Sequence, residues 1–201
     1  MKPCVLLCNG LSGSGKSFFI KNYLPVDAFY KLRSATTRPM RNGEIANQEY
    51  FFVDESFFDI TRLATRLWVN KQIWQPGQPK WLYGVPESEI LDNPNINLVY
   101  DVIEPKYARQ LIDWFHLQKL GNKYTFKTLY FLPPDNNFDI AQSRANMPND
   151  ATVRHTNTCN PIDFLRAELD IDFLVKCSAT ETIISHRLRE FISRQSNVRP
   201  K

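Results

Sequence analysis

Short apolar runs alternate with longer amphipathic stretches along the chain. Four apolar runs have the length and composition of buried strands, at residues 4–8, 97–102, 126–132 and 171–175. Four stretches place apolar residues at helical spacing, at residues 17–24, 106–119, 162–169 and 181–194. Strands that alternate with helices in this way predict an α/β fold, with a parallel sheet flanked by helices.

The two longest helical stretches each carry an apolar stripe. In residues 106–119 the stripe comprises Ala108, Leu111, Ile112, Phe115 and, just beyond, Leu120. In residues 181–194 it comprises Ile183, Ile184, Leu188, Phe191 and Ile192. Both stretches are predicted to cover a face of the sheet.

Composition adds limits to this picture. The 201 residues are 43% apolar and 23% charged, which suits one globular domain. No apolar run approaches the ~20 residues that span a bilayer, and the N-terminus has no secretory signal, so we expect a cytosolic protein without a membrane partner. The net charge of +4 is modest. It favours small polyanions over nucleic acid as ligands.

The four cysteines have neither disulfide nor zinc spacing. Cys4 and Cys8 flank the apolar residues of the first strand, and the strand period of two places them on one face, where we expect small buried side chains.

Residues 10–17 read Gly-Leu-Ser-Gly-Ser-Gly-Lys-Ser, between the first predicted strand and the first predicted helix. This is the phosphate-binding loop pattern GxxxxGK[ST], whose backbone N–H groups surround a polyphosphate. The predicted ligands of ATP are Ser12, Gly13, Ser14, Gly15, Lys16 and Ser17. In such a loop the lysine ammonium reaches the outer phosphates and the serine hydroxyl binds Mg²⁺. We therefore predict a P-loop NTPase-type sheet that uses ATP and Mg²⁺, with Lys16 as a catalytic residue and Ser17 as the metal ligand.

A second anion site is indicated by Arg38 and Arg41, which lie three residues apart around a proline. Two guanidinium groups can converge there on one phosphate, whose oxygens accept their paired N–H donors.

The same region resembles the guanylate kinase family. Residues 34–44 read S-A-T-T-R-P-M-R-N-G-E, close to the pattern S-x-T-T-R-x-x-R-x-G-E of that family, and Tyr50-Phe51-Phe52-Val53 and Phe57-Phe58 follow as they do there. The resemblance implies that Arg38, Arg41, Tyr50 and Tyr83 hold the phosphate of the acceptor, and that Ser34 contacts either its base or its phosphate. Asp101, which ends the second buried strand, stands at the first position of the D-x-D pattern of the family, where it can hold the water of Mg²⁺ or the acceptor.

The resemblance also implies a division of the single domain. It comprises a core at residues 1–32, 94–134 and 162–201, an inserted acceptor-binding lobe at 33–93, and a lid at 135–161. Arg144 and Arg154 lie in that lid, where arginines would close on the transferred phosphoryl group, and both are predicted catalytic residues.

Three positions depart from the pattern by which guanylate kinases read guanine. Val85 replaces the hydroxyl residue of a Tyr-Gly-Thr/Ser segment, Ile103 replaces the second aspartate of D-x-D, and residues 68–82 contain no acidic residue. The segment Trp74-Gln75-Pro76-Gly77, followed by Tyr83-Gly84-Val85-Pro86, is similar instead to ribose 1,5-bisphosphokinases.

Three hypotheses follow. The first is an ATP-dependent nucleoside monophosphate kinase that acts on GMP, dGMP or a related nucleotide. The second keeps the kinase but changes the acceptor to ribose 1,5-bisphosphate or a modified nucleotide. The third is a non-catalytic binding module, which Lys16 and Ser17 make less favourable because such modules tend to lose that lysine. In the kinase hypotheses the partner is a small nucleotide or sugar phosphate, and we expect a monomer or homodimer.

Overall fold

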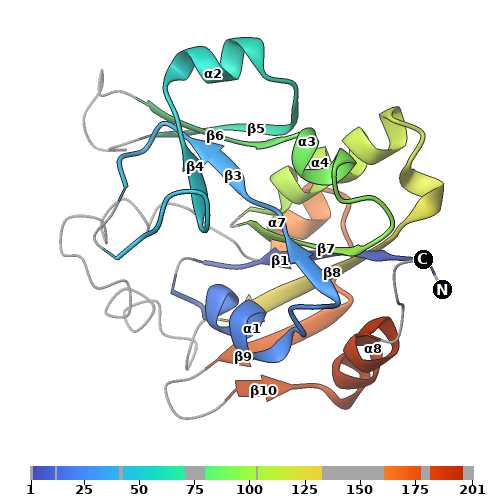
Figure 1. The fold of residues 1–201 in the computed structure, drawn as a ribbon. Coiled ribbons are helices and arrows are strands. Elements are labelled where there is room, and N and C mark those ends of the chain that lie inside the picture. Colours follow the sequence, from blue (N-terminus) through green and yellow to red (C-terminus); the bar gives the residue numbers. More distant parts are fainter. Residues whose placement is uncertain are drawn as a thin grey trace.

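The computed structural model describes residues 2–11, 13–40, 43–70, 80–102, 104–132, 161–177 and 182–196. The described part of the chain forms two sheets (Figure 1). The main sheet has the strand order β10-β9-β8-β1-β7-β2. Its strands are β1 (Cys4–Asn9), β2 (Phe29–Lys31), β7 (Asn97–Val102), β8 (Thr125–Leu132), β9 (Phe173–Cys177) and β10 (Thr182–Ile184).

Strand β1 lies in the middle of the main sheet and pairs in parallel with both β7 and β8. Every residue of β1 is buried, as a strand covered on both faces requires. Cys4, Leu6 and Cys8 pack into one core cluster and Val5 and Leu7 into the other. The prediction that the two cysteines share a buried face is therefore confirmed.

Helices cover both faces of the main sheet (Figure 1). On one face lie α1 (Lys16–Tyr23) and α8 (His186–Ser196), which contribute Phe19, Leu188 and Ile192 to the cluster of Cys4 and Cys8. On the other lie α4 (Pro105–Leu117) and α7 (Pro161–Arg166), and the 3₁₀ turn η1 (Gly121–Lys123) follows α4. The predicted stripe of α4 is buried at Ala108, Leu111, Ile112 and Phe115, together with Trp114.

The second sheet has the order β4-β3-β6-β5 and is inserted between β2 and β7. Its elements are β3 (Ser34–Thr36), β4 (Tyr50–Phe52), α2 (Glu55–Ile60), β5 (Leu63–Asn70), β6 (Lys80–Pro86) and α3 (Ser88–Leu91). Ala35, Phe58 and Leu82 form its own small core. The second sheet thus has a small core of its own, while Ala64 of β5 and Val85 of β6 pack into the main-sheet cluster that contains Val5 and Leu7.

The C-terminal region differs from the prediction. Residues 182–184 form strand β10, antiparallel to β9, where the apolar pattern predicted the first turn of a helix. The β-branched side chains of Ile183 and Ile184 suit a strand. The helix begins only after Ser185, whose hydroxyl accepts a hydrogen bond of 3.2 Å from the Leu188 N–H. The main sheet is therefore parallel except at this edge strand.

Within the described ranges, no helix has the length and apolar character that crossing a membrane requires.

Candidate functional site

The first half of the site is the loop between β1 and α1. Gly13 and Gly15 have φ angles of 81° and 90°, a left-handed conformation that glycine adopts without a steric penalty. At Gly10 a Cβ atom would lie 2.9 Å from both Cβ and the carbonyl oxygen of Phe131. Gly13 and Gly15 therefore allow the backbone conformation of the loop, and Gly10 allows its close approach to Phe131, as expected of a loop that surrounds phosphates.

Lys16 begins α1 and its side chain folds back over this loop. Its Nζ donates hydrogen bonds of 2.7 and 2.9 Å to the carbonyl oxygens of Gly10 and Leu11, and lies 3.9 Å from Asp101 Oδ1. The side chain is only 7% exposed. The ammonium group is therefore held at the loop by neighbouring acceptors.

Ser17 and Asp101 meet across the end of the main sheet. The Ser17 hydroxyl donates a hydrogen bond of 3.2 Å to Asp101 Oδ2. Strands β1 and β7 pair in parallel, with Asp101 opposite Cys8, the last residue but one of β1. Asp101 therefore lies at the same end of the sheet as the loop that follows β1. A hydroxyl and a carboxylate are hard oxygen donors, so this pair fits Mg²⁺.

The N-terminus of α1 has no side-chain cap, since Gly15 occupies the cap position. The first N–H groups of a helix can then bind an anion, and the helix dipole favours negative charge there. The Ser14 hydroxyl is fully buried and has no hydrogen-bond partner among the described residues. The loop therefore holds both backbone and hydroxyl donors that a bound anion would satisfy.

The second half of the site lies on the smaller sheet, around Arg38. Its side chain is 3% exposed and forms two hydrogen bonds with Glu44, from Nη1 to Oε2 at 2.9 Å and from Nη2 to Oε1 at 2.8 Å. Burial disfavours the charge, but the Glu44 carboxylate and Tyr83 more than offset this, so the pKa of Arg38 is raised. The arginine remains a cation in a nearly closed environment.

Aromatic rings surround this guanidinium group. Arg38 Cζ lies 5.3 Å from the centre of the Tyr50 ring and 5.4 Å from that of Phe52. The rings of Tyr50 and Tyr83 meet edge to face, with their centres 6.0 Å apart. Ser34 pairs with Tyr50 in the β3–β4 register. Four predicted acceptor residues, Ser34, Arg38, Tyr50 and Tyr83, are therefore brought together.

Val85, two residues after Tyr83 in β6, is fully buried and packs in the core cluster of Val5, Leu7 and Tyr100. Its N–H donates a hydrogen bond of 3.1 Å to Thr65 Oγ1, which in turn lies 3.2 Å from the hydroxyl of Tyr100. Burial raises the pKa of Tyr100, so its phenol stays protonated. Position 85 therefore offers an apolar side chain, and its backbone N–H is engaged by Thr65.

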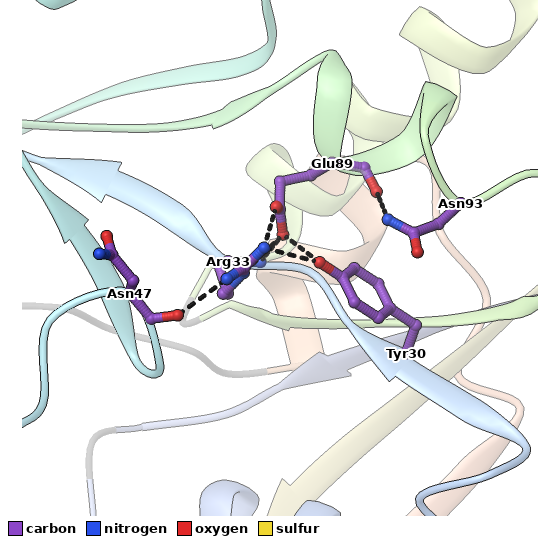
Figure 2. Close-up of polar contacts among 5 residues, drawn as sticks. All are labelled: Tyr30, Arg33, Asn47, Glu89 and Asn93. Atoms are coloured by element: carbon purple, nitrogen blue, oxygen red, sulfur yellow. Dashed lines mark hydrogen bonds and ion pairs between the residues drawn. The ribbon is translucent and has the colours of Figure 1, made fainter.

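Three charged residues of this region were not predicted as site residues: Arg33, Glu44 and Glu89. Glu44 pairs with Arg38, and Arg33 pairs with the buried Glu89 (Figure 2). The glutamate of the S-x-T-T-R-x-x-R-x-G-E pattern was visible in the sequence, but its pairing with Arg38 was not. For Glu89 the sequence carries no signal, because its partner lies 56 positions away.

Four predicted site residues lie outside the described residues: Ser12, Arg41, Arg144 and Arg154. The same holds for Ile103 and Trp74, on which part of the acceptor argument rested.

No model of a protein family matches the chain. In sequence it is similar to the guanylate kinase of Rhodopirellula baltica, 34% identical over 93 residues that cover 45% of this chain and 43% of the relative. It is 34% identical to that of a Synechococcus species over 110 residues, 53% of this chain and 57% of the relative. With that of Sulfurimonas denitrificans it shares 44% identity over 55 residues, 27% of each chain. The chain thus spans about half the length, or less, of the curated relatives that it matches.

A crystal structure of guanylate kinase from Anaplasma phagocytophilum matches with a TM-score of 0.50 and 17% identity, over 98% of this chain and 84% of that one. At this identity the match concerns the fold alone. The sequence comparisons confirm the inferred resemblance to the guanylate kinase family. The chain therefore has the P-loop α/β fold of a guanylate kinase and resembles the guanylate kinase family in sequence over about half of its length.

Proposed function

We propose that the protein is an ATP-dependent kinase that transfers the γ-phosphoryl group to the phosphate of a nucleoside monophosphate. The observation that carries the proposal is the convergence of Lys16 and Ser17 on Asp101 at the end of a glycine-rich loop. The similarity to guanylate kinases supports the same reaction class.

On the donor side, the loop backbone and the first turn of α1 would hold the phosphates of ATP. Lys16 Nζ is within reach of this loop and would neutralise charge on the outer phosphates. Ser17 and Asp101 would hold Mg²⁺, directly or through water. When bound, Mg²⁺ offsets the negative charge that develops during transfer.

On the acceptor side, Arg38 would bind the monophosphate, with Tyr50 and Tyr83 beside it. In the structure the Glu44 carboxylate occupies both outer nitrogens of Arg38, in the paired geometry that a phosphate also accepts. Glu44 would thus keep the guanidinium oriented until the acceptor phosphate binds, either beside the Glu44 carboxylate or in its place. Transfer then depends on positioning and charge neutralisation, without a covalent intermediate on the protein.

The decisive experiment replaces the lysine of the loop. We expect Lys16→Ala to lower the kcat of phosphoryl transfer from ATP by about 100-fold or more, because the phosphates lose their cation in a low-dielectric site. The matched control is Lys21→Ala, an exposed lysine of the same helix, which should retain wild-type turnover. Undiminished turnover by Lys16→Ala would contradict the mechanism.

A second candidate keeps the kinase and changes the acceptor. Two observations favour it: the side chain of Val85 is apolar, and residues 63–86, which include β5 and β6, contain no aspartate or glutamate that could accept hydrogen bonds from a guanine edge. The same assay, run with a panel of nucleoside monophosphates and with ribose 1,5-bisphosphate, distinguishes the candidates. GMP or dGMP as the clearly best acceptor would exclude the second one.

A further inference from the structure

Arg33 lies at the junction of the two sheets. Strand β2 of the main sheet ends at Lys31 and strand β3 of the smaller sheet begins at Ser34, so only Leu32 and Arg33 connect them. Leu32 is buried and its N–H donates to the carbonyl oxygen of Val99 in β7. The junction is therefore anchored to the main sheet directly before Arg33.

Glu89 of α3 fixes the Arg33 side chain at this junction (Figure 2). Oε2 accepts hydrogen bonds from Arg33 Nε at 3.1 Å and from the Arg33 backbone N–H at 2.9 Å, and Oε1 accepts one from Nη2 at 2.7 Å. The Tyr30 hydroxyl donates to Oε2 at 3.0 Å. Glu89 is only 6% exposed, so its charge is compensated at a buried site. The pair thus holds the guanidinium in one orientation.

The remaining nitrogen of Arg33 reaches the acceptor side. Nη1 donates a hydrogen bond of 2.8 Å to the carbonyl oxygen of Asn47, and Cζ lies 4.6 Å from the centre of the Phe51 ring. Asn47 has a φ of 66° and its N–H donates to the carbonyl oxygen of Tyr50 at 2.9 Å. A chain of contacts therefore runs from the buried carboxylate, through Arg33, to the backbone of Tyr50.

We propose that Arg33, held by Glu89, is a positioning residue for the acceptor phosphate site: it fixes the turn at Asn47 and thereby places Tyr50 beside Arg38. This inference rests on the proposed function, which makes Tyr50 an acceptor ligand. Arg33 acts through the turn and is not itself a phosphate ligand, because its donors are directed to Glu89, Tyr30 and Asn47. The proposed role of Arg33 therefore concerns binding of the acceptor, and loss of Arg33 should leave the proposed ATP loop unchanged.

A second arginine–glutamate pair, next to the same short helix, provides a matched control. Arg62 Nε lies 3.1 Å from Glu87 Oε2, but the Arg62 side chain is 78% exposed. Glu87 also accepts a hydrogen bond of 2.8 Å from Trp114 Nε1, so it retains a buried partner when Arg62 is removed. Loss of this exposed arginine should leave Tyr50 in place.

The test compares Arg33→Met with Arg62→Met in steady-state kinetics. We expect Arg33→Met to raise the KM for the acceptor by about tenfold or more, the scale of one lost charged hydrogen bond, while the KM for ATP stays within about twofold. Arg62→Met should match wild type in both. Because Arg33→Met leaves Glu89 buried without its cation, the double variant Arg33→Met with Glu89→Gln is measured too and should show the same rise. An unchanged acceptor KM, or equal rises for ATP and acceptor, would overturn the proposal.

A second readout does not require turnover. Hydrogen exchange at the amides of Asn47 and of residues 50–52 should be faster in Arg33→Met than in wild type, and unchanged in Arg62→Met. If wild type transfers no phosphoryl group to any acceptor, the proposed function fails, whereas unaltered exchange in Arg33→Met refutes the role of Arg33 on its own.

Discussion

Buried or half-buried charges in this protein are compensated by partners that lie close by. The charge of Arg38 is nearly buried, and Glu44 compensates it by accepting hydrogen bonds from both of its outer nitrogens, which helps to raise its pKa. Arg33 is stabilised in the same way by its hydrogen bonds with Glu89, which raise its pKa. Each of these two arginines is thus part of a pair. The pair of Arg38 belongs to the proposed acceptor site, and the Arg33 of the other pair contacts the turn at Asn47.

The buried thiols of β1 lead to a prediction about pH. Burial raises the pKa of Cys4 to about 12 and also raises that of Cys8, whereas a thiol in the unfolded chain ionises near pH ~8.5. Only the unfolded state loses the proton above that pH. Stability is therefore fully present below pH ~8.5 and falls as the pH rises toward the folded values, by about 1.4 kcal/mol per pH unit for each thiol.

Urea unfolding under reducing conditions, at pH values from about 7.5 to 10.5, measures this effect. Cys8→Ala should show a shallower loss of unfolding free energy with pH than wild type. The control is Leu6→Ala, which removes a buried side chain from the same cluster without removing a thiol, and should lower stability equally at every pH. Parallel curves for wild type and Cys8→Ala would contradict the expectation.

At the scale of elements, local patterns predicted the first strand and helix better than they predicted the edge of the main sheet. The strand and helix within residues 4–24 lie where the sequence pattern predicted them. Their signals are local, because they consist of a buried apolar run, a glycine-rich loop and apolar residues at helical spacing. The error at residues 182–184 has an equally local cause. Ile183 and Ile184 fit the stripe of α8 by spacing, and only the neighbouring β9 edge makes a strand of them.

The hairpin of β5 and β6 yields a prediction at this scale. A Cβ atom on Gly84 would lie 2.5 Å from the carbonyl oxygen of Thr65 in the adjacent strand, and that backbone would have to move. We expect Gly84→Ala to lower the unfolding free energy by about 1–3 kcal/mol through overpacking. Denaturant unfolding measures it, with the exposed Ser88→Ala of the next helix as a control that should change little. Equal stabilities would show that the two strands separate without cost.

At the scale of the whole molecule, strand β7 connects the two halves of the site. Asp101 contacts Ser17 and Lys16 at the glycine-rich loop, while the preceding residue, Tyr100, contacts Thr65 of the smaller sheet. Each half nevertheless has apolar packing of its own, since α1 after the loop packs in the cluster of Cys4 and Cys8, and the smaller sheet has the small core of Phe58 and Leu82. The two halves should therefore bind their ligands independently when one is disabled.

Thermal unfolding with ligands tests this independence. A ligand at 100 times its Kd stabilises the folded state by about 2.7 kcal/mol, which raises the Tm of a protein of this size by roughly 5–10 °C. We expect Lys16→Ala to lose the shift caused by ATP and Mg²⁺ and to retain the shift caused by the acceptor. Loss of both shifts in this variant, or of neither, would contradict independent binding by the two halves.

The sequence by itself determined the glycine-rich loop between a buried strand and a helix, and the residue types of the Arg38 cluster, because these depend on glycine conformations, charge type and short spacings that a local pattern contains. Only the tertiary structure decided which carboxylate each arginine meets. Arg33 and its partner Glu89 lie 56 positions apart in the sequence. The amide of Val85 and the hydroxyl of Tyr100 both contact the hydroxyl of Thr65. Such pairings depend on how the chain returns across the second sheet, which no stretch of neighbouring residues encodes.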